Sequence, residues 1–108
     1  MELLEKRLYY IDLLHLYGEL LSVTQKDILT DNLEFDLSLS EIASNREISR
    51  AAVEDAIKKG IKKLDEYEKN LKVLENNEQI LSLIEKVKDL EGTEKIQTLE
   101  EIERIIYK

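Results

Sequence analysis

The fold is decided by residues 38–53, which read SLSEIASNREISRAAV. Ser38 is suited to cap a short helix, and Ser49 is the natural cap of a second helix, because a serine hydroxyl accepts a hydrogen bond from a free backbone N–H of the first turn. The polar stretch 44–47 separates the two helices, and Ala43 is small where they approach most closely. This order of elements predicts a helix-turn-helix.

The two faces of this motif are predicted to have different tasks. Its apolar side chains are expected to pack the pair onto supporting helices: Ile42, Ala43, Ile48, Val53 and Ile57. The start of the second helix projects outward, where six side chains are candidates to contact nucleic acid: Ser49, Arg50, Ala51, Glu54, Lys58 and Lys62. Arginine pairs with guanine edges in the major groove, and lysine neutralises phosphate. The alternative is a solvated face whose four-residue steps place ordinary surface charges together.

Residues 1–37 are expected to form supporting helices. Leu4, Leu8, Ile11 and Leu14 recur at steps of three or four residues, which is typical of a helix with a buried face. Gly18 indicates a break or a close crossing. Residues 24–27, TQKD, predict a capping box at the start of the next helix.

The chain beyond the motif is expected to form a long helical extension. Ile57, Leu64 and Leu71 are one heptad apart, and a second series is offset from it: Gly60, Tyr67, Leu74 and Leu81. These heptads predict a coiled-coil-like seam. We expect the helix to bend or break at Asn76–Asn77 and a last helix to begin at Thr93, after Gly92. The prediction is an all-α protein, a single domain over 1–108 with N-terminal helices (1–37), a helix-turn-helix (38–66) and an extension that serves oligomerisation (67–108).

Composition excludes several classes of protein. The 108 residues include 24 acids and 16 bases, giving a net charge of −8, with no cysteine and one histidine. Disulfide frameworks, thiolate zinc sites and histidine metal clusters are therefore excluded. Charges interrupt every window of the roughly 20 apolar residues that a membrane span needs, and the first residues lack the pattern of a signal peptide. We expect a soluble, cytoplasmic protein without membrane insertion. Residues 49–64 alone are basic, with five bases against two acids.

No residue pattern predicts an enzyme. There is no nucleophile with an adjacent base and no phosphate-binding glycine loop, so we expect no catalytic residues, no cofactor and no metal. His15 lies in an apolar stretch and is expected to be packed with a single hydrogen bond. Tyr9, Tyr10 and Tyr17 are expected to pack in a core or interface, the alternative being a platform on which single-stranded bases stack.

The motif resembles the helix-turn-helix of sigma-factor region 4, and a longer resemblance to the YlxM family spans most of the chain. The residues that carry it between positions 7 and 68 are Arg7, Tyr17, Leu20, Leu21, Thr24, Gln25, Lys26, Asp36, Glu41, Ile42, Ala43, Ser49, Arg50, Ala52, Val53, Asp55, Ile57, Lys58, Leu64, Tyr67 and Glu68. The resemblance implies a regulatory protein of the signal recognition particle pathway that is described as DNA-binding. Glu47 stands where sigma-like motifs have glycine or asparagine, which predicts a wider or differently routed turn.

Three functions are consistent with the sequence. The resemblance implies an accessory of the signal recognition particle pathway that contacts its RNA or its GTPase. The helix-turn-helix alone predicts a transcription regulator that reads duplex DNA. A module that only binds other proteins is the third. The acidic surroundings and Glu54–Asp55 favour the first and third over strong non-specific DNA binding. The apolar seam favours a two-fold homodimer.

Overall fold

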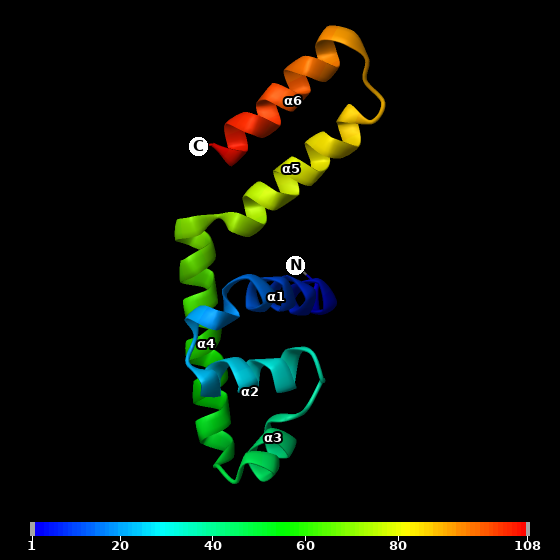
Figure 1. Cartoon of the computed structure of the whole chain (residues 1–108). Coiled ribbons are helices and arrows are strands. Elements are labelled where there is room, and N and C mark those ends of the chain that lie inside the picture. The colour runs from blue at the N-terminus through cyan, green and yellow to red at the C-terminus, as the bar shows by residue number, and fades with distance from the viewer. Residues whose placement is uncertain (1, 108) are drawn as a thin grey trace. The chain divides into compact units, whose positions relative to one another are not determined.

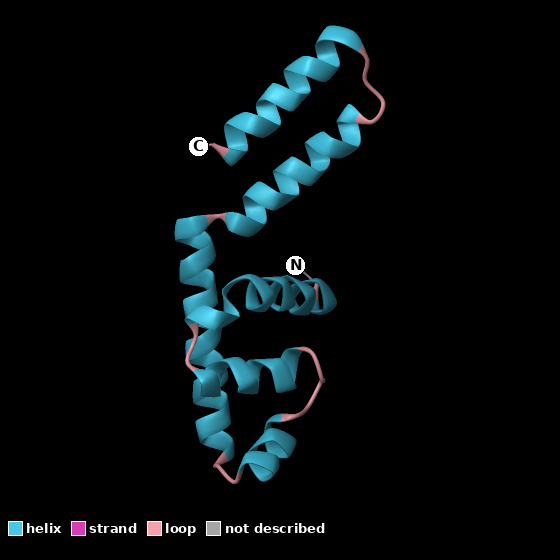
Figure 2. Cartoon of the chain, in the orientation of Figure 1, coloured by secondary structure: helices cyan, strands magenta, loops and turns pink. Residues whose placement is uncertain are grey.

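The computed structural model describes residues 2–107, and in that range it contains helices joined by short loops and no strand (Figures 1 and 2). The all-α class is therefore confirmed. The chain divides into two compact units, one ending at Leu71 and the other beginning at Lys72, which we call the N-terminal and C-terminal units. The predicted boundary between residues 66 and 67 falls inside a helix, five residues before this division.

Two helices support the motif in the N-terminal unit. Helix α1 spans Leu3–Tyr17, and a 3-10 turn, η1, follows over Gly18–Leu20. Helix α2 spans Val23–Leu33 and begins with a capping box between Ser22 and Gln25. The capping box predicted at Thr24–Asp27 is thus wrong by two residues, because Ser22 takes the extended backbone that a cap requires and Thr24 is already helical.

The helix-turn-helix is formed by α3 (Leu39–Arg46) and α4 (Arg50–Leu71). Ser38 and Glu41 form a capping box at the start of α3, and the Ser49 hydroxyl accepts a hydrogen bond from the Ala52 N–H at 3.0 Å. Glu47 ends α3 in the left-handed conformation, with φ 56° and ψ 42°. The turn therefore keeps the backbone that a glycine would take, and glutamate bears a strain of roughly 1 kcal/mol there instead of widening the turn.

One part of the core of the N-terminal unit lies where α2, α3 and α4 meet, and a second part is formed by buried residues of α1, Leu13, Leu14 and Tyr17. Ile42, Ala43 and Val53 are buried with Ile28 of α2, and Ile57 is half-buried against them, as predicted. Ile48 is 38% exposed, so its place in the predicted packing set is wrong. Its N–H instead closes the turn on the Ala43 carbonyl at 3.1 Å, which fixes the backbone and leaves the side chain half outside.

The C-terminal unit is a helical hairpin of α5 (Val73–Val87) and α6 (Gly92–Ile106), which lie side by side in Figure 1. Lys72, in the left-handed conformation at φ 56°, separates α5 from α4. The break predicted at Asn76–Asn77 is therefore wrong, since both asparagines lie within α5. The continuous heptad seam is wrong for the same reason: Leu64 is buried in the N-terminal unit, but Leu71 is 52% exposed at the end of α4.

Candidate nucleic-acid interface

The six residues predicted to contact nucleic acid are all exposed at the N-terminal end of α4 or along its outer side. Ala51, Glu54, Lys58 and Lys62 follow one another at three- and four-residue steps, which places them on one face of the helix. Val53, Gly60 and Leu64 occupy the opposite, buried side. We call the exposed set Ser49, Arg50, Ala51, Glu54, Lys58 and Lys62 the α4 face.

The cations of α4 between residues 50 and 63 fall into two groups. Lys59 pairs with Asp55 one turn away, Nζ to Oδ2 at 3.0 Å, and the Lys63 Nζ donates to the Gln25 Oε1 at 3.2 Å. Within residues 2–107, Arg50, Lys58 and Lys62 form no ion pair. These three charges remain available to an anionic partner.

Acidic side chains on and beside the α4 face limit which ligands it can bind. Glu54 lies between Arg50 and Lys58 on the exposed side of α4, and Glu47 is exposed in the turn just before it. A carboxylate repels phosphate but accepts a hydrogen bond from the amino group of cytosine. The arrangement therefore disfavours loose binding to a phosphate backbone and is compatible with a ligand that places a donor at Glu54.

Side-chain contacts fix the orientation of the motif against its supports. The Arg46 Nε and Nη2 both donate to Asp31 Oδ2, at 3.0 and 2.7 Å, which ties the end of α3 to α2. Gly60 lets α4 approach α2 closely, because an added Cβ would lie 2.7 Å from Leu29 Cδ1. The motif is thus held against α2 by an ion pair at the end of α3 and by close packing of α4.

The tyrosines anchor the second half of α4. The Tyr10 hydroxyl donates to Asp65 Oδ2 at 3.2 Å, and the buried Tyr17 donates to Glu68 Oε1 at 2.7 Å. The Tyr67 hydroxyl donates to the Leu20 carbonyl at 3.2 Å. Burial, and then the hydrogen bond and charge of Asp65, raise the pKa of Tyr10 to about 12. The sequence predicted packing for Tyr10 and Tyr17, but it did not predict their hydrogen bonds to α4. The signal that could have indicated these bonds is the pair of acids Asp65 and Glu68, three residues apart on that helix.

His15 is not packed as predicted. Its side chain is 63% exposed, and its Nε2 meets the Glu34 carboxylate just beyond the end of α2. The expectation of a single polar partner agrees with this contact. The imidazole therefore forms a surface contact between α1 and the residue that follows α2.

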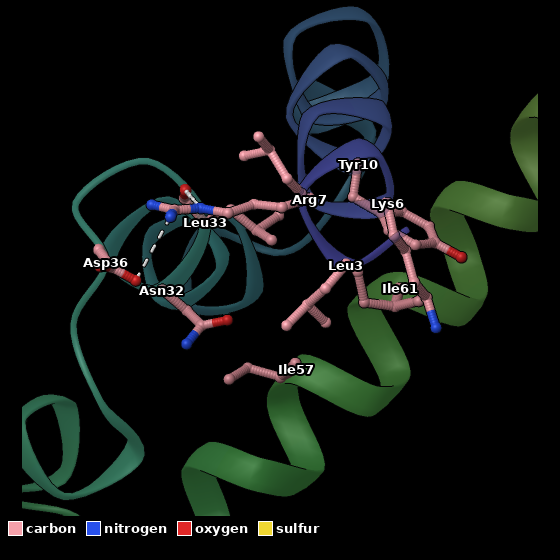
Figure 3. Close-up of a pocket in the computed structure, with 10 residues that line it drawn as sticks. Leu3, Lys6, Arg7, Tyr10, Asn32, Leu33, Asp36, Ile57 and Ile61 are labelled. Carbon is pink, nitrogen blue, oxygen red and sulfur yellow. Dashed lines mark hydrogen bonds and ion pairs between the residues drawn. The ribbon is translucent and has the colours of Figure 1, made fainter. Parts of the chain in front are cut away.

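A groove missed by the sequence analysis lies on the inner side of α4 (Figure 3). It has a volume of about 590 Å³, with Ile57 and Ile61 of α4 on one side and Leu3 of α1 facing them. Arg7 closes one end: its Nε donates to the Leu33 carbonyl at 2.8 Å, and its Nη1 lies 3.4 Å from Asp36 Oδ1. The groove brings together residues far apart in the sequence, so periodicity alone gave no sign of it.

Residues 2–107 contain neither a cluster of metal-ligating side chains nor a membrane-spanning helix. No three histidine, aspartate or glutamate side chains gather closely enough there to hold a metal ion. None of the helices in that part of the chain is both long and apolar enough to cross a membrane.

Comparison with known proteins gives a consistent result. Residues 4–104 match a family model described as "Putative helix-turn-helix protein, YlxM / p13 like". The chain is similar to a UPF0122 protein of Fusobacterium nucleatum, 42% identical over 95 residues, or 88% of this chain and 86% of that protein. It is 41% identical to a UPF0122 protein of Mycoplasma capricolum over 102 residues, 93% and 90% of the two chains. A UPF0122 protein of Clostridium acetobutylicum is 32% identical over 111 residues, 95% and 96% of the two chains.

Proposed function

The chain belongs to the UPF0122 family of YlxM/p13-like helix-turn-helix proteins, and on this premise we propose that it is a regulatory protein that binds nucleic acid through the α4 face. The role is one of binding and not of catalysis. Its setting is the signal recognition particle pathway, which the resemblance to YlxM proteins supplies. Regulation acts through a specific nucleic-acid site, and duplex DNA is the ligand that a helix-turn-helix fits best.

The observation that supports this proposal is the set of three cations without ion pairs on one exposed side of a fixed helix. Arg50 lies in the first turn of α4, where a helix entering the major groove presents side chains to base edges. Lys58 and Lys62 follow roughly 12 and 18 Å farther along the axis, at 1.5 Å per residue, and are placed to meet phosphates. Glu54, which lies between Arg50 and Lys58, adds selectivity, because its carboxylate binds a hydrogen-bond donor such as the amino group of cytosine and repels phosphate.

A two-fold homodimer is part of the proposal. Two copies related by a two-fold axis present two α4 faces, and a palindromic site in duplex DNA is read when the recognition helices are one helical turn apart, about 34–36 Å. Doubling the number of cations also strengthens binding by a protein whose net charge of −8 opposes it.

The test is a fluorescence-anisotropy titration of the full chain with duplex DNA from upstream of its own gene and, in parallel, with signal recognition particle RNA, each at two salt concentrations. Lys58→Gln and Lys59→Gln form a matched pair. Both remove one positive charge from neighbouring positions, but only Lys58 is on the α4 face, whereas Lys59 is paired with Asp55. We expect Lys58→Gln to weaken binding and to lower the salt slope by about two, one for each copy of the dimer, with Lys59→Gln close to the wild type.

The outcomes distinguish the candidate ligands. DNA binding that weakens with salt and is abolished by Arg50→Glu supports the regulator. If only the RNA binds, and Lys58→Gln weakens that binding, the ligand of the α4 face is the signal recognition particle RNA and not DNA. Binding of neither ligand refutes the proposal and leaves a module that binds proteins, with the particle's GTPase as the first candidate. Equal effects of Lys58→Gln and Lys59→Gln would show that overall charge, not the α4 face, determines binding.

A further inference from the structure

The hairpin of the C-terminal unit has a second apolar surface besides the one that joins its two helices. Five large apolar side chains are exposed on it: Leu81, Ile84, Ile96, Leu99 and Ile106. Leu81 and Ile96 are 62% and 59% exposed, so the hairpin itself does not cover them. We call these five residues the hairpin face.

Helix geometry places four of these residues on one side of the hairpin, and Ile96, three residues before Leu99, neighbours them on α6. Ile80 and Leu83 on α5 and Thr98 and Ile105 on α6 are buried or half-buried, which places them at the contact between the two helices. Each is followed directly by a member of the hairpin face: Leu81, Ile84, Leu99 and Ile106. Successive residues of a helix are separated by about 100° around its axis. Because α5 and α6 run in opposite directions, the residues that directly follow the contact positions on the two helices lie on the same side of the hairpin.

The opposite side of the hairpin supports this geometry. By the same rule, the residues directly before the contact positions share the other side. Gln79 and Ser82 precede Ile80 and Leu83, and Glu101 precedes Ile102, which is also buried. All three line one groove of about 520 Å³ together with Leu83 and Ile105. That side is polar and acidic, so the hairpin is apolar on one side and hydrophilic on the other.

A two-helix unit of this size needs a partner for its exposed apolar side. The unit begins at Lys72 and contains 37 residues, and domains below about 40 residues usually need disulfides, metals or oligomerisation to be stable. The chain has no cysteine. The hairpin face exposes roughly 500 Å² per chain, which is most of the ~800 Å² that each partner contributes to a standard interface.

We propose that the hairpin face binds the same face of a second copy of this chain, so that two hairpins form an antiparallel four-helix bundle. The inference names the surface of the dimer that is part of the proposed function. Its occupant is a second copy because a two-fold axis makes one apolar face complementary to itself without any further partner. Four-helix bundles bury apolar stripes of this spacing in their cores.

Charges on the edge of the hairpin face set the direction of the second copy. Lys95 precedes Leu99 by four residues, and Glu103 follows it by four, so both lie on the same side of α6. Neither forms an ion pair within residues 2–107. In an antiparallel arrangement the α5–α6 loops of the two copies lie at opposite ends of the bundle. A two-fold axis at the level of Leu99 then brings Lys95 of each copy close to Glu103 of the other.

The first test is the molar mass of the full chain by sedimentation equilibrium without nucleic acid, at about 100 µM, where a micromolar dissociation constant leaves most chains paired. We expect twice the chain mass of 12.7 kDa for the wild type. Leu81→Glu should raise the dissociation constant roughly 30-fold or more. Ser82→Glu is the matched control, because it places the same carboxylate one residue away on the polar side, and it should leave the dimer intact. Circular dichroism checks that both variants retain the helices.

The second test uses charge and keeps the proposal falsifiable if Leu81→Glu unfolds the hairpin. Lys95→Glu and Glu103→Lys should each weaken the dimer, and the double variant should restore it, since it re-forms the pair with its sign reversed. A wild-type mass of one chain overturns the inference and shows that the face is covered within the chain or by another protein. A dimer that survives both Leu81→Glu and the single charge reversals also overturns it. No nucleic acid is present in these measurements, so their failure leaves the role of the α4 face to its own titration.

Discussion

Gly60→Ala tests whether the position of α4 is set by its close approach to α2. Helix propensity alone predicts that alanine stabilises the middle of a helix by about 1 kcal/mol over glycine. In the structure, however, the added Cβ would lie 2.7 Å from Leu29 Cδ1 and 3.3 Å from Leu29 Cγ. Leu29 is fully buried, so its side chain has no free space to move into. Overpacking of this kind costs about 1–3 kcal/mol, and we expect a net loss of about 1 kcal/mol in the free energy of unfolding.

Urea unfolding followed by tyrosine fluorescence measures this loss in the relevant unit, because four of the five tyrosines lie in the N-terminal unit. The control is Gly18→Ala. Its Cβ would lie 3.5 Å from Leu14 Cδ1, an ordinary contact, and Gly18 has a helical φ of −56°. We expect Gly18→Ala to stabilise the protein by about 0.4–1 kcal/mol, so that the same substitution has opposite signs at the two glycines.

A stabilising Gly60→Ala would refute the reasoning, since it would mean that α2 and α4 are farther apart than the structure places them. The cycle with Leu29→Ala separates the clash from propensity. Leu29→Ala costs about 2–5 kcal/mol by itself, but it removes the two atoms that the new Cβ would meet. In that background Gly60→Ala should become stabilising, and a coupling energy near zero would rule out a direct contact.

Three further predictions concern the packing, the turn and the tyrosines. Ile42→Ala should cost about 2–5 kcal/mol in urea unfolding, whereas Ile48→Ala should cost far less, because Ile42 is fully buried and Ile48 is 38% exposed. Glu47→Gly should raise the unfolding free energy by about 1 kcal/mol by relieving the positive φ, and Glu47→Ala should not. Titration by ultraviolet absorbance should show a pKa of Tyr10 of about 12, which Asp65→Asn lowers but does not return to 10.0, because burial persists. Since the folded protein holds this proton more tightly, its contribution to stability is complete below pH 10 and is lost as the pH rises towards 12.

The helix-turn-helix could be predicted because its signals are local. Ser38 and Ser49 cap the two helices as their spacing indicates, and the α4 face is exposed along the predicted side. The ion pairs were less predictable. The four-residue rule also allowed a pair between Glu54 and Lys58, but the structure pairs Lys59 with Asp55 instead. When a side chain has several possible partners within reach, its tertiary surroundings determine which pair forms, and these surroundings cannot be read from the sequence.

The end of α4 could not be predicted for a related reason. The bend or break was expected at Asn76–Asn77, where the heptad register blurs, yet the chain turns at Lys72. Local preference also favours the asparagines, because asparagine adopts the left-handed conformation more readily than lysine. Tertiary contacts explain the position better than local preference. Tyr67 and Glu68 make the last hydrogen bonds between α4 and the α1–η1 segment, and the break comes one turn later. The heptad pattern runs through it unchanged, because apolar residues at the same spacing serve one core before Lys72 and another after it.

The hairpin face and the α4 face are linked, because dimer formation sets how many cations meet the nucleic acid. One α4 face offers three cations, Arg50, Lys58 and Lys62, which gives a salt slope of about −3 if each neutralises one phosphate. A dimer offers six and a slope of about −5. Leu81→Glu leaves the α4 face unchanged, so it should halve the slope by separating the copies, whereas Ser82→Glu should not. A Leu81→Glu monomer with the full slope would mean that one copy reads the nucleic acid alone and that the dimer has another purpose.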